Sequence, residues 1–300
     1  MTTRISLETF VNTALLSIQQ NASRMLDLQE KISSGKKINR PSDDPAGASN
    51  ILSLRSEKLK LEQYSSNIQT ATQSLDFNAS TLQNVSSILQ RAQELTIQGV
   101  DDSKSQSDRN IIAGEINQLL ESILREANSK LSGRYVFAGT KTTTTPFTAT
   151  RNTSGNISAV TYNGNNEKIE YQVGPGFNVQ VNQPGQEAFI DSKIFSTLIS
   201  VRDSLSSGAM TFARNELDNI NSAHEAVLNL ISRAGGIAST LELTRNRVED
   251  TKLSVNSFLA STESADLSEL VLKLKEQENI FQASLASGTL IFRTTILDFM

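Results

Sequence analysis

Residues 61–98 have the sequence LEQYSSNIQTATQSLDFNASTLQNVSSILQRAQELTIQ, and the spacing of their apolar side chains decides the fold. Apolar residues recur in steps of three and four, with one break at Asn78, at the following positions: Leu61, Tyr64, Ile68, Ala71, Leu75, Leu82, Val85, Leu89 and Ala92. This is the a/d pattern of a coiled-coil seam. A helix over residues 48–98 would be about 75 Å long, too long to be buried in a compact globule. The sequence therefore predicts a helical rod.

Similar apolar seams occupy both ends of the chain. We predict an assembly interface there, made of Leu15, Ile18, Met25, Leu267, Val271, Leu274, Phe281, Leu285 and Phe292. The two seams pair with each other, with neighbouring subunits, or with both. Membrane-surface binding is disfavoured, because the polar faces are rich in Ser, Thr, Gln and Asn instead of Lys and Arg.

The middle of the chain has a different composition. Residues 133–190 hold three of the five Pro, seven of the 15 Gly and three of the four Tyr. Apolar and polar residues alternate over 168–173 and 177–182, with a Gly-Pro-Gly turn signal at 174–176 between them. Asn163-Gly164 is a hairpin dipeptide. We expect a small antiparallel β-domain here.

The predicted fold is mainly α: a long coiled-coil-like helical rod formed by N- and C-terminal arms, with the β-domain inserted in the middle. We expect a further helix over 107–130, capped by Ser107-Asp108. The predicted domains are a terminal coiled coil (1–45 with 259–300), a rod (46–142 with 191–258) and the β-domain (143–190).

Composition argues against several functions. The chain has 300 residues, a net charge of −4, no Cys, one His and no Trp. Thiolate chemistry and disulfides are excluded, and so is a multi-histidine metal site within one chain. The charge balance gives no basic face for nucleic acid, and no stretch reaches the 18 apolar residues of a membrane span. We predict no enzyme, cofactor or metal. The N-terminus lacks the pattern of a cleaved secretion signal.

Three groups of polar residues have a structural interpretation beside a functional one. Asp43-Asp44 could bind a cation or do acid–base work, but a turn and helix N-cap before Pro45 is favoured. His224 has no catalytic partner suggested by the sequence, so a partly buried structural histidine is expected. Arg91, Glu94 and Glu115 form ion pairs or set the register between subunits.

Several motifs resemble the flagellin superfamily. The sequence SSGKKINRPSDDPAG (33–47) is similar to a stretch near the N-terminus of its members, and RAQELTIQ (91–98) with SQSDR (105–109) resembles its inner domain. The motif residues are Gly35, Asn39, Asp43, Asp44, Arg91 and Glu94. Arg4-Ile5-Ser6 and GRYVFAGTKT (133–142) are similar to the hook-associated type 3 branch. QASLAS (282–287) fits the superfamily, whereas residues 289–300 fit it less well.

The resemblance implies a structural subunit of the bacterial flagellum that joins hook to filament. It implies type III export with an uncleaved N-terminus, a chaperone at the C-terminal helix, and self-assembly with flagellin and neighbouring hook-associated proteins. The implied location is extracellular, at the hook–filament junction. Filament flagellin is the alternative, and a secreted enzyme or adhesin on a coiled-coil stalk is a remote one.

Overall fold

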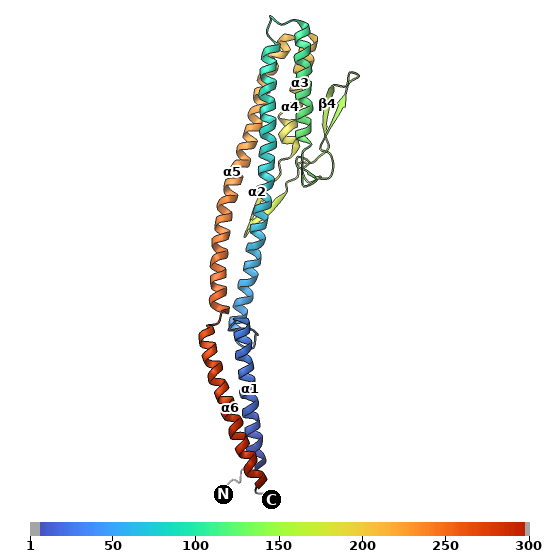
Figure 1. Ribbon diagram of the computed structural model, residues 1–300. Coiled ribbons are helices and arrows are strands. Elements are labelled where there is room, and N and C mark those ends of the chain that lie inside the picture. The colour runs from blue at the N-terminus through green and yellow to red at the C-terminus, as the bar shows by residue number, and fades with distance from the viewer. Residues whose placement is uncertain (1–6, 298–300) are drawn as a thin grey trace. The chain divides into compact units, whose positions relative to one another are not determined.

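The computed structural model describes residues 7–297, with side chains at position 9 and over 11–289 (Figure 1). In chain order the elements are α1 (Leu7–Ser34), α2 (Pro45–Gly99), α3 (Gln106–Ala127), β1 (Lys130–Leu131), β2 (Arg134–Tyr135), β3 (Phe147–Arg151), β4 (Ile157–Tyr162), β5 (Glu170–Gly174), β6 (Phe177–Gln180), the π-helical η1 (Gln186–Asp191), α4 (Ile194–Ser207), α5 (Met210–Glu263) and α6 (Leu267–Leu297). They form two compact units, residues 61–250 and the two chain ends.

Helix α2 confirms the predicted seam. It extends over 55 residues, three beyond the predicted start and one beyond the predicted end. All the seam residues are buried except Tyr64, which is half-buried. Helix α5 runs alongside α2 within residues 61–250 (Figure 1), and polar bonds such as Gln93 Nε2 to Asn221 Oδ1, 2.7 Å, join the two helices. The heptad pattern thus marks the face that α2 buries.

The cap of α3 differs from the prediction. Ser105, and not Ser107-Asp108, is the N-cap. Its hydroxyl accepts from the Asp108 backbone N–H at 3.1 Å, and the Asp108 carboxylate accepts from the Ser105 N–H at 3.1 Å. This is a capping box. The prediction therefore assigned Asp108 to the correct end of the helix. In the structure Asp108 is the third residue of the helix and not its cap.

The helices and the inserted segment share one hydrophobic core. Phe137, Phe147, Phe189 and Phe195 pack with ring centroids 5.1–6.0 Å apart in edge-on, tilted and stacked pairs. They are continuous with buried residues of α2, α3, α4 and α5. The strands of residues 143–190 therefore lie on the helices and contribute to their core. The predicted domain boundaries remain a prediction.

The strands form three two-stranded antiparallel hairpins. β5 and β6 turn through residues 174–176, as the Gly-Pro-Gly signal predicts. The hairpin expected at Asn163-Gly164 is wrong, because β4 pairs with the preceding strand β3 and the turn is residues 152–156. There the Asn152 Oδ1 accepts from the backbone N–H groups of Ser154 and Asn156, each at 3.0 Å, and Gly155 supplies a φ of +80°.

Asn163-Gly164 instead lies where the chain leaves β4. The Tyr162 hydroxyl lies 3.0 Å from the Phe137 carbonyl oxygen and 2.9 Å from that of Asn165, so its one proton bonds either of them. Any side chain at Gly164 would collide with the Tyr162 ring. The glycine permits a close approach there and not a hairpin turn. Among the described residues, no helix is both long and apolar enough to cross a membrane.

Candidate assembly interface

The two terminal helices, α1 and α6, lie side by side (Figure 1). Four residues of the predicted interface are half-buried between them: Ile18, Met25, Leu274 and Phe281. The helices approach closely at Gly288, which is buried, because a Cβ there would lie only 3.2 Å from Ile18 Cδ1. The structure therefore brings the N- and C-terminal seams together within one chain.

The pair leaves much of its apolar surface exposed. The other predicted interface residues with described side chains remain 42–51% exposed: Leu15, Leu267, Val271 and Leu285. The side chain of Phe292 lies outside the described residues. A groove of about 450 Å³, lined mainly by small side chains such as Ala14, Ala283 and Ser287, lies along the pair. Two helices alone therefore cover only part of the seam.

A polar contact that the sequence analysis missed fixes the register of the pair. Asn21 Nδ2 donates to Ser284 Oγ at 2.8 Å, and Gln277 Nε2 donates to the Asn21 carbonyl at 3.3 Å. Gln277 is buried although it is polar. A buried polar residue in a seam specifies alignment, because any other register leaves its amide without partners.

The motif at residues 33–47 forms the connection from α1 to α2. Gly35, with a φ of +69°, ends α1 in the left-handed conformation. Asp43 Oδ2 accepts from the backbone N–H groups of Asn39 and Arg40, each at 3.0 Å. These bonds, that of Arg40 foremost, lower the pKa of Asp43.

Asp44 Oδ1 accepts from the Gly47 N–H at 2.9 Å and caps α2, with Pro45 as its first residue. A larger residue at position 47 would displace the side chains of Asp44 and Ile38, because a Cβ there would overlap both. Both aspartates are therefore engaged with the backbone, and the favoured structural interpretation is confirmed.

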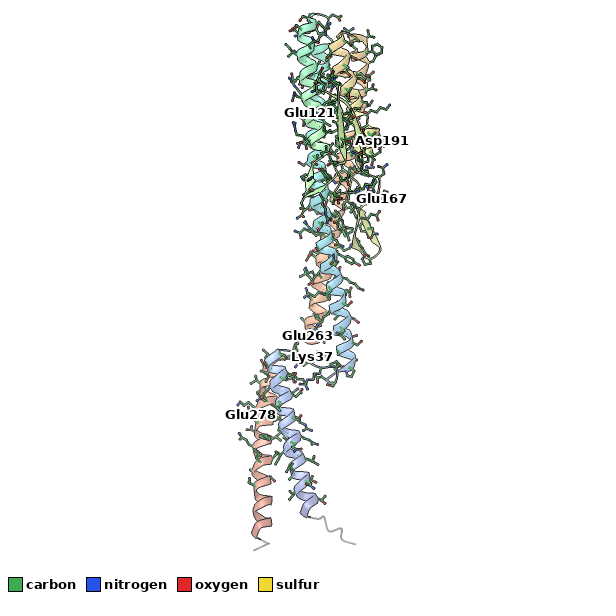
Figure 2. All side chains as sticks on the ribbon, turned by 90° about the vertical axis from the view of Figure 1, so that its right-hand side faces the viewer. Lys37, Glu121, Glu167, Asp191, Glu263 and Glu278 are labelled. Atoms are coloured by element: carbon green, nitrogen blue, oxygen red, sulfur yellow. The ribbon has the colours of Figure 1, made fainter. Side chains whose placement is uncertain are left out.

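The return connection, from α5 to α6, is bonded to the same loop. The Lys37 N–H donates to the Glu263 carbonyl at 2.8 Å, and the Ala265 N–H donates to the Gly35 carbonyl at 3.0 Å. Lys36 and Arg55 both form ion pairs with the Glu263 carboxylate, which is 11% exposed. Figure 2 shows Lys37 and Glu263 together at this point. Pairing of the terminal arms was predicted, but these particular contacts between the two connections were not.

Arg91, Glu94 and Glu115 form an exposed cluster between α2 and α3. Arg91 Nη2 lies 2.8 Å from Glu115 Oε1, and its Nη1 lies 3.1 Å from Glu94 Oε2. The hydrogen bond that Arg91 donates to Glu115, followed by the one that it donates to Glu94, raises the pKa of Arg91. The ion pairs join two helices of one chain, as one of the two interpretations expected. A role between subunits remains a prediction.

His224 is a half-buried residue of α5, as expected, and its Nε2 lies 2.8 Å from the Ser86 hydroxyl of α2, so the contact joins these two helices. Its structural role stays a prediction. Within the described residues, no group of three or more His, Asp or Glu side chains is placed to hold a metal ion.

Comparison with known proteins agrees with the motifs. Residues 5–142 match the model of the bacterial flagellin N-terminal helical region. The match covers just under half of the 300 residues. Flagellar hook-associated protein 3 of Escherichia coli (strain K12) is 29% identical over 70% of this chain and 63% of its own length. The match thus spans less than two thirds of that relative. A flagellin from Listeria innocua is 24% identical over 92% of this chain and 93% of its own.

Solved structures of a flagellar hook-associated protein and a flagellar junction protein share the fold. The flagellar hook-associated protein-3 from Legionella pneumophila aligns with a TM-score of 0.64 at 19% identity, covering 70% of this chain and 98% of that one. A structure described as the flagellar junction protein from the same organism aligns with a TM-score of 0.58 at 20% identity, covering 73% and 100%. The fold is therefore shared with these proteins over 70–73% of this chain.

Proposed function

We propose that this chain is a structural subunit of the bacterial flagellum that joins the hook to the filament. The observation that carries the proposal is the α1–α6 pair, whose apolar seam stays 42–51% exposed at four predicted interface positions. Burying such a seam against another copy is favourable, by a free energy of about 25 cal/mol per Å² of apolar surface. Neighbouring copies supply the cover, so the chain functions through assembly and not through catalysis.

The superfamily supports the rest of the proposal. The chain leaves the cell through the flagellar type III apparatus, with a chaperone holding the C-terminal helix, and assembles outside the cell next to flagellin and other hook-associated proteins. The E. coli relative named for the hook favours the junction position. The Listeria flagellin matches a larger share of the chain, and it supports filament flagellin as the alternative.

Deletion of the gene from a motile host distinguishes the two. Loss of a junction subunit leaves hooks without filaments while flagellin accumulates in the medium. Loss of filament flagellin removes the bulk protein of the filament, and no flagellin of that kind is then found in the medium. Complementation with the full chain restores swimming in either case and controls for effects on neighbouring genes.

A further inference from the structure

The continuous hydrophobic core of residues 61–250 ends part-way along the α2–α5 pair. Its last buried members before that end are Leu82 on α2 and Leu230 on α5. Beyond them the two helices still bury side chains such as Ile68 and Leu241, which lie outside the core that α3, α4 and the phenylalanine rings share. The pair therefore has a core segment and, beyond it, a distal segment made of residues 61–77 and 237–250.

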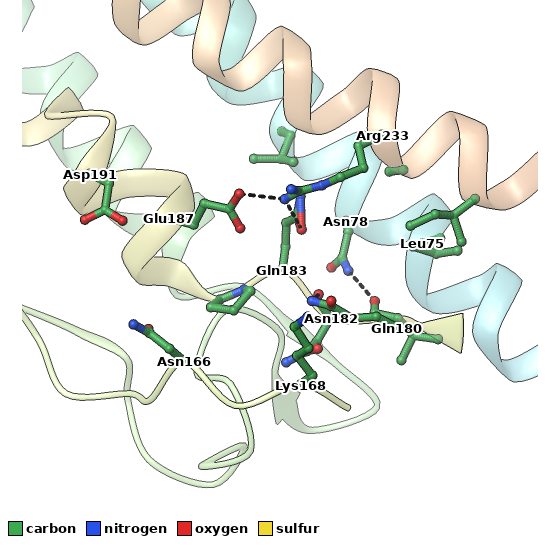
Figure 3. Close-up of a pocket in the computed structure, with 15 residues that line it drawn as sticks. Leu75, Asn78, Asn166, Lys168, Gln180, Asn182, Gln183, Glu187, Asp191 and Arg233 are labelled. Carbon is green, nitrogen blue, oxygen red and sulfur yellow. Dashed lines mark hydrogen bonds and ion pairs between the residues drawn. The ribbon is translucent and has the colours of Figure 1, made fainter. Parts of the chain in front are cut away.

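A cavity of about 380 Å³ lies between α2 and α5 where the shared core ends (Figure 3). Both helices contribute to its lining, with Leu75, Asn78 and Leu82 from α2 and Arg233, Ala234 and Ile237 from α5. Protein interiors are otherwise close-packed, and side chains that face a void lose contacts with the atoms that would fill it. The packing between the two helices is therefore weakest at this level.

Asn78 places a buried polar side chain at the same level of α2, where the heptad repeat is interrupted. It is 2% exposed, and its Nδ2 donates to the Val181 carbonyl at 3.0 Å. Its Oδ1 accepts no hydrogen bond from any described residue. A buried acceptor without a donor is unfavourable, and that penalty is relieved when water reaches it. The closed arrangement of α2 and α5 is therefore destabilised at this residue.

Two consecutive glycines, Gly235 and Gly236, lie in the interior of α5 between the cavity-lining Ala234 and Ile237. Glycine is the least favourable residue in a helix interior apart from proline. Both glycines are exposed and have an ordinary helical backbone, and a Cβ on either would meet no atom beyond the helix's own backbone within 4 Å. Neither close packing nor a left-handed conformation therefore accounts for them. Glycine positions of this kind are among the places where long helices bend.

We propose that Gly235 and Gly236 form a hinge at which the distal segment bends relative to the core segment. The two glycines absorb the change in the backbone of α5. The cavity gives the helices room to move, and the bend admits water to Asn78 Oδ1. The hinge is a property of the single chain, so it is independent of the function proposed above.

Polar contacts hold the two sides of this hinge. Arg233 precedes the glycines, and its Nη2 lies 2.8 Å from Glu187 Oε1 of η1, the element whose Phe189 belongs to the shared core (Figure 3). On the distal segment, Asn67 Nδ2 donates to the Gln172 carbonyl of β5 at 2.7 Å. The β5–β6 hairpin therefore moves with the distal segment, while η1 stays with the core segment.

Hydrogen exchange of the backbone amides in the full chain tests for local opening at the hinge. The protection factors of residues 235–240 should be at least about tenfold lower than those of residues 222–230 in the same helix. Gly235→Ala combined with Gly236→Ala should raise them about tenfold, because alanine favours the helix and both methyl groups fit without a clash. Gly114→Ala in α3 is the matched control, since Gly114 is also an exposed, uncrowded helix residue. It should leave residues 235–240 unchanged.

Distances between spin labels measure the bend itself. The chain has no cysteine, so two introduced cysteines take all the label. Gln118→Cys with Asn246→Cys connects the core segment to the distal segment, and Gln118→Cys with Asn229→Cys lies within the core segment; all three positions are exposed. Double electron–electron resonance should give a broader distance distribution for the first pair. The double alanine variant should narrow it to the width of the second.

Circular dichroism confirms the helical content of each variant, so that a loss of structure is not mistaken for a bend. The proposal is overturned if residues 235–240 are as protected as residues 222–230, or if the two label pairs give equally broad distributions. It is also overturned if the double alanine variant changes neither measurement, or if Gly114→Ala protects residues 235–240 to the same extent.

Discussion

Arg55 and Glu263 meet across 208 positions of sequence, with Arg55 Nη2 lying 2.7 Å from Glu263 Oε1. Lys36 pairs with the same oxygen. Together with the backbone bonds from Lys37 and Ala265, they tie the α1–α2 connection to the α5–α6 connection. The two connections that lead to the terminal helices are therefore both bonded to one carboxylate.

Replacing Glu263 by Gln should lower the free energy of unfolding by about 1 kcal/mol at pH 7, because the two cationic partners are themselves almost half exposed. Burial alone would raise the pKa of Glu263, but the hydrogen bond of Lys36 and the charges of Arg55 and Lys36 outweigh it and lower the pKa. The stabilisation is therefore complete above the ordinary Glu pKa of about 4.3 and is lost as pH falls through the lowered value.

Urea unfolding at several pH values measures this difference. Glu269→Gln is the control, because Glu269 is 62% exposed and pairs only locally with Lys273. A difference between wild type and Glu263→Gln that persists unchanged at pH 2 would contradict the assignment.

Phe147 contributes to the shared core from the inserted segment. Its side chain is 1% exposed and contacts the rings of Tyr162, Phe189 and Phe195. Phe147→Ala should cost about 3–5 kcal/mol. Phe177→Ala, in the same segment but 38% exposed, should cost far less. Thermal unfolding followed by circular dichroism compares the two, and equal losses would show that the insert folds apart from the helices.

Arg202 carries a buried charge that links α4 to two other elements. It is 3% exposed, and its Nη1 donates to Asn117 Oδ1 of α3 at 2.9 Å and to the Ile157 carbonyl of β4. Arg202→Ala leaves both acceptors without this donor and should cost about 2–4 kcal/mol. Arg214→Ala is the control, since that arginine is half exposed. Chemical unfolding of the two variants should separate them, and a loss of under 0.5 kcal/mol for Arg202→Ala contradicts the linking role.

The terminal seam should be needed for assembly but not for folding of residues 61–250. Leu274→Glu combined with Phe281→Glu introduces charge where α6 contacts α1, which is unfavourable by several kcal/mol. We expect a soluble, largely helical protein that gives hooks without filaments. Leu272→Glu on the same helix is the control, because Leu272 is 72% exposed. Normal swimming with the double variant would exclude Leu274 and Phe281 from the working interface.

The sequence predicted α2 almost to the residue, because a heptad repeat reports directly which face of a helix is buried. The sequence could not assign a role to Asn78. This residue interrupts the repeat, and its side chain donates a hydrogen bond to the carbonyl of Val181, 103 positions away. The sequence missed Arg202 for a similar reason, since a buried arginine and a solvated one look alike without their partners. The prediction of a hairpin at Asn163-Gly164 was wrong because β4 pairs with β3, through the turn at 152–156 that the Asn152 side chain stabilises.

The candidate interface was predicted only in part. Spacing predicted Ile18, Met25, Leu274 and Phe281 on facing seams, and in the structure α1 and α6 pair and these four side chains are half-buried. The bond from Asn21 to Ser284 that aligns these helices depends on register, which apolar spacing does not specify. The contact between Arg55 and Glu263 could not be predicted either, because no local pattern relates residues 208 positions apart.

The position of the chain along the flagellum tests the central claim most directly. Gold-labelled antibody against the β5–β6 hairpin, applied to detached flagella in the electron microscope, locates it without altering the protein. The account predicts label confined to one site, where the hook ends and the filament begins, in a small and constant amount per flagellum. Label distributed along the whole filament would contradict it and identify the chain as filament flagellin.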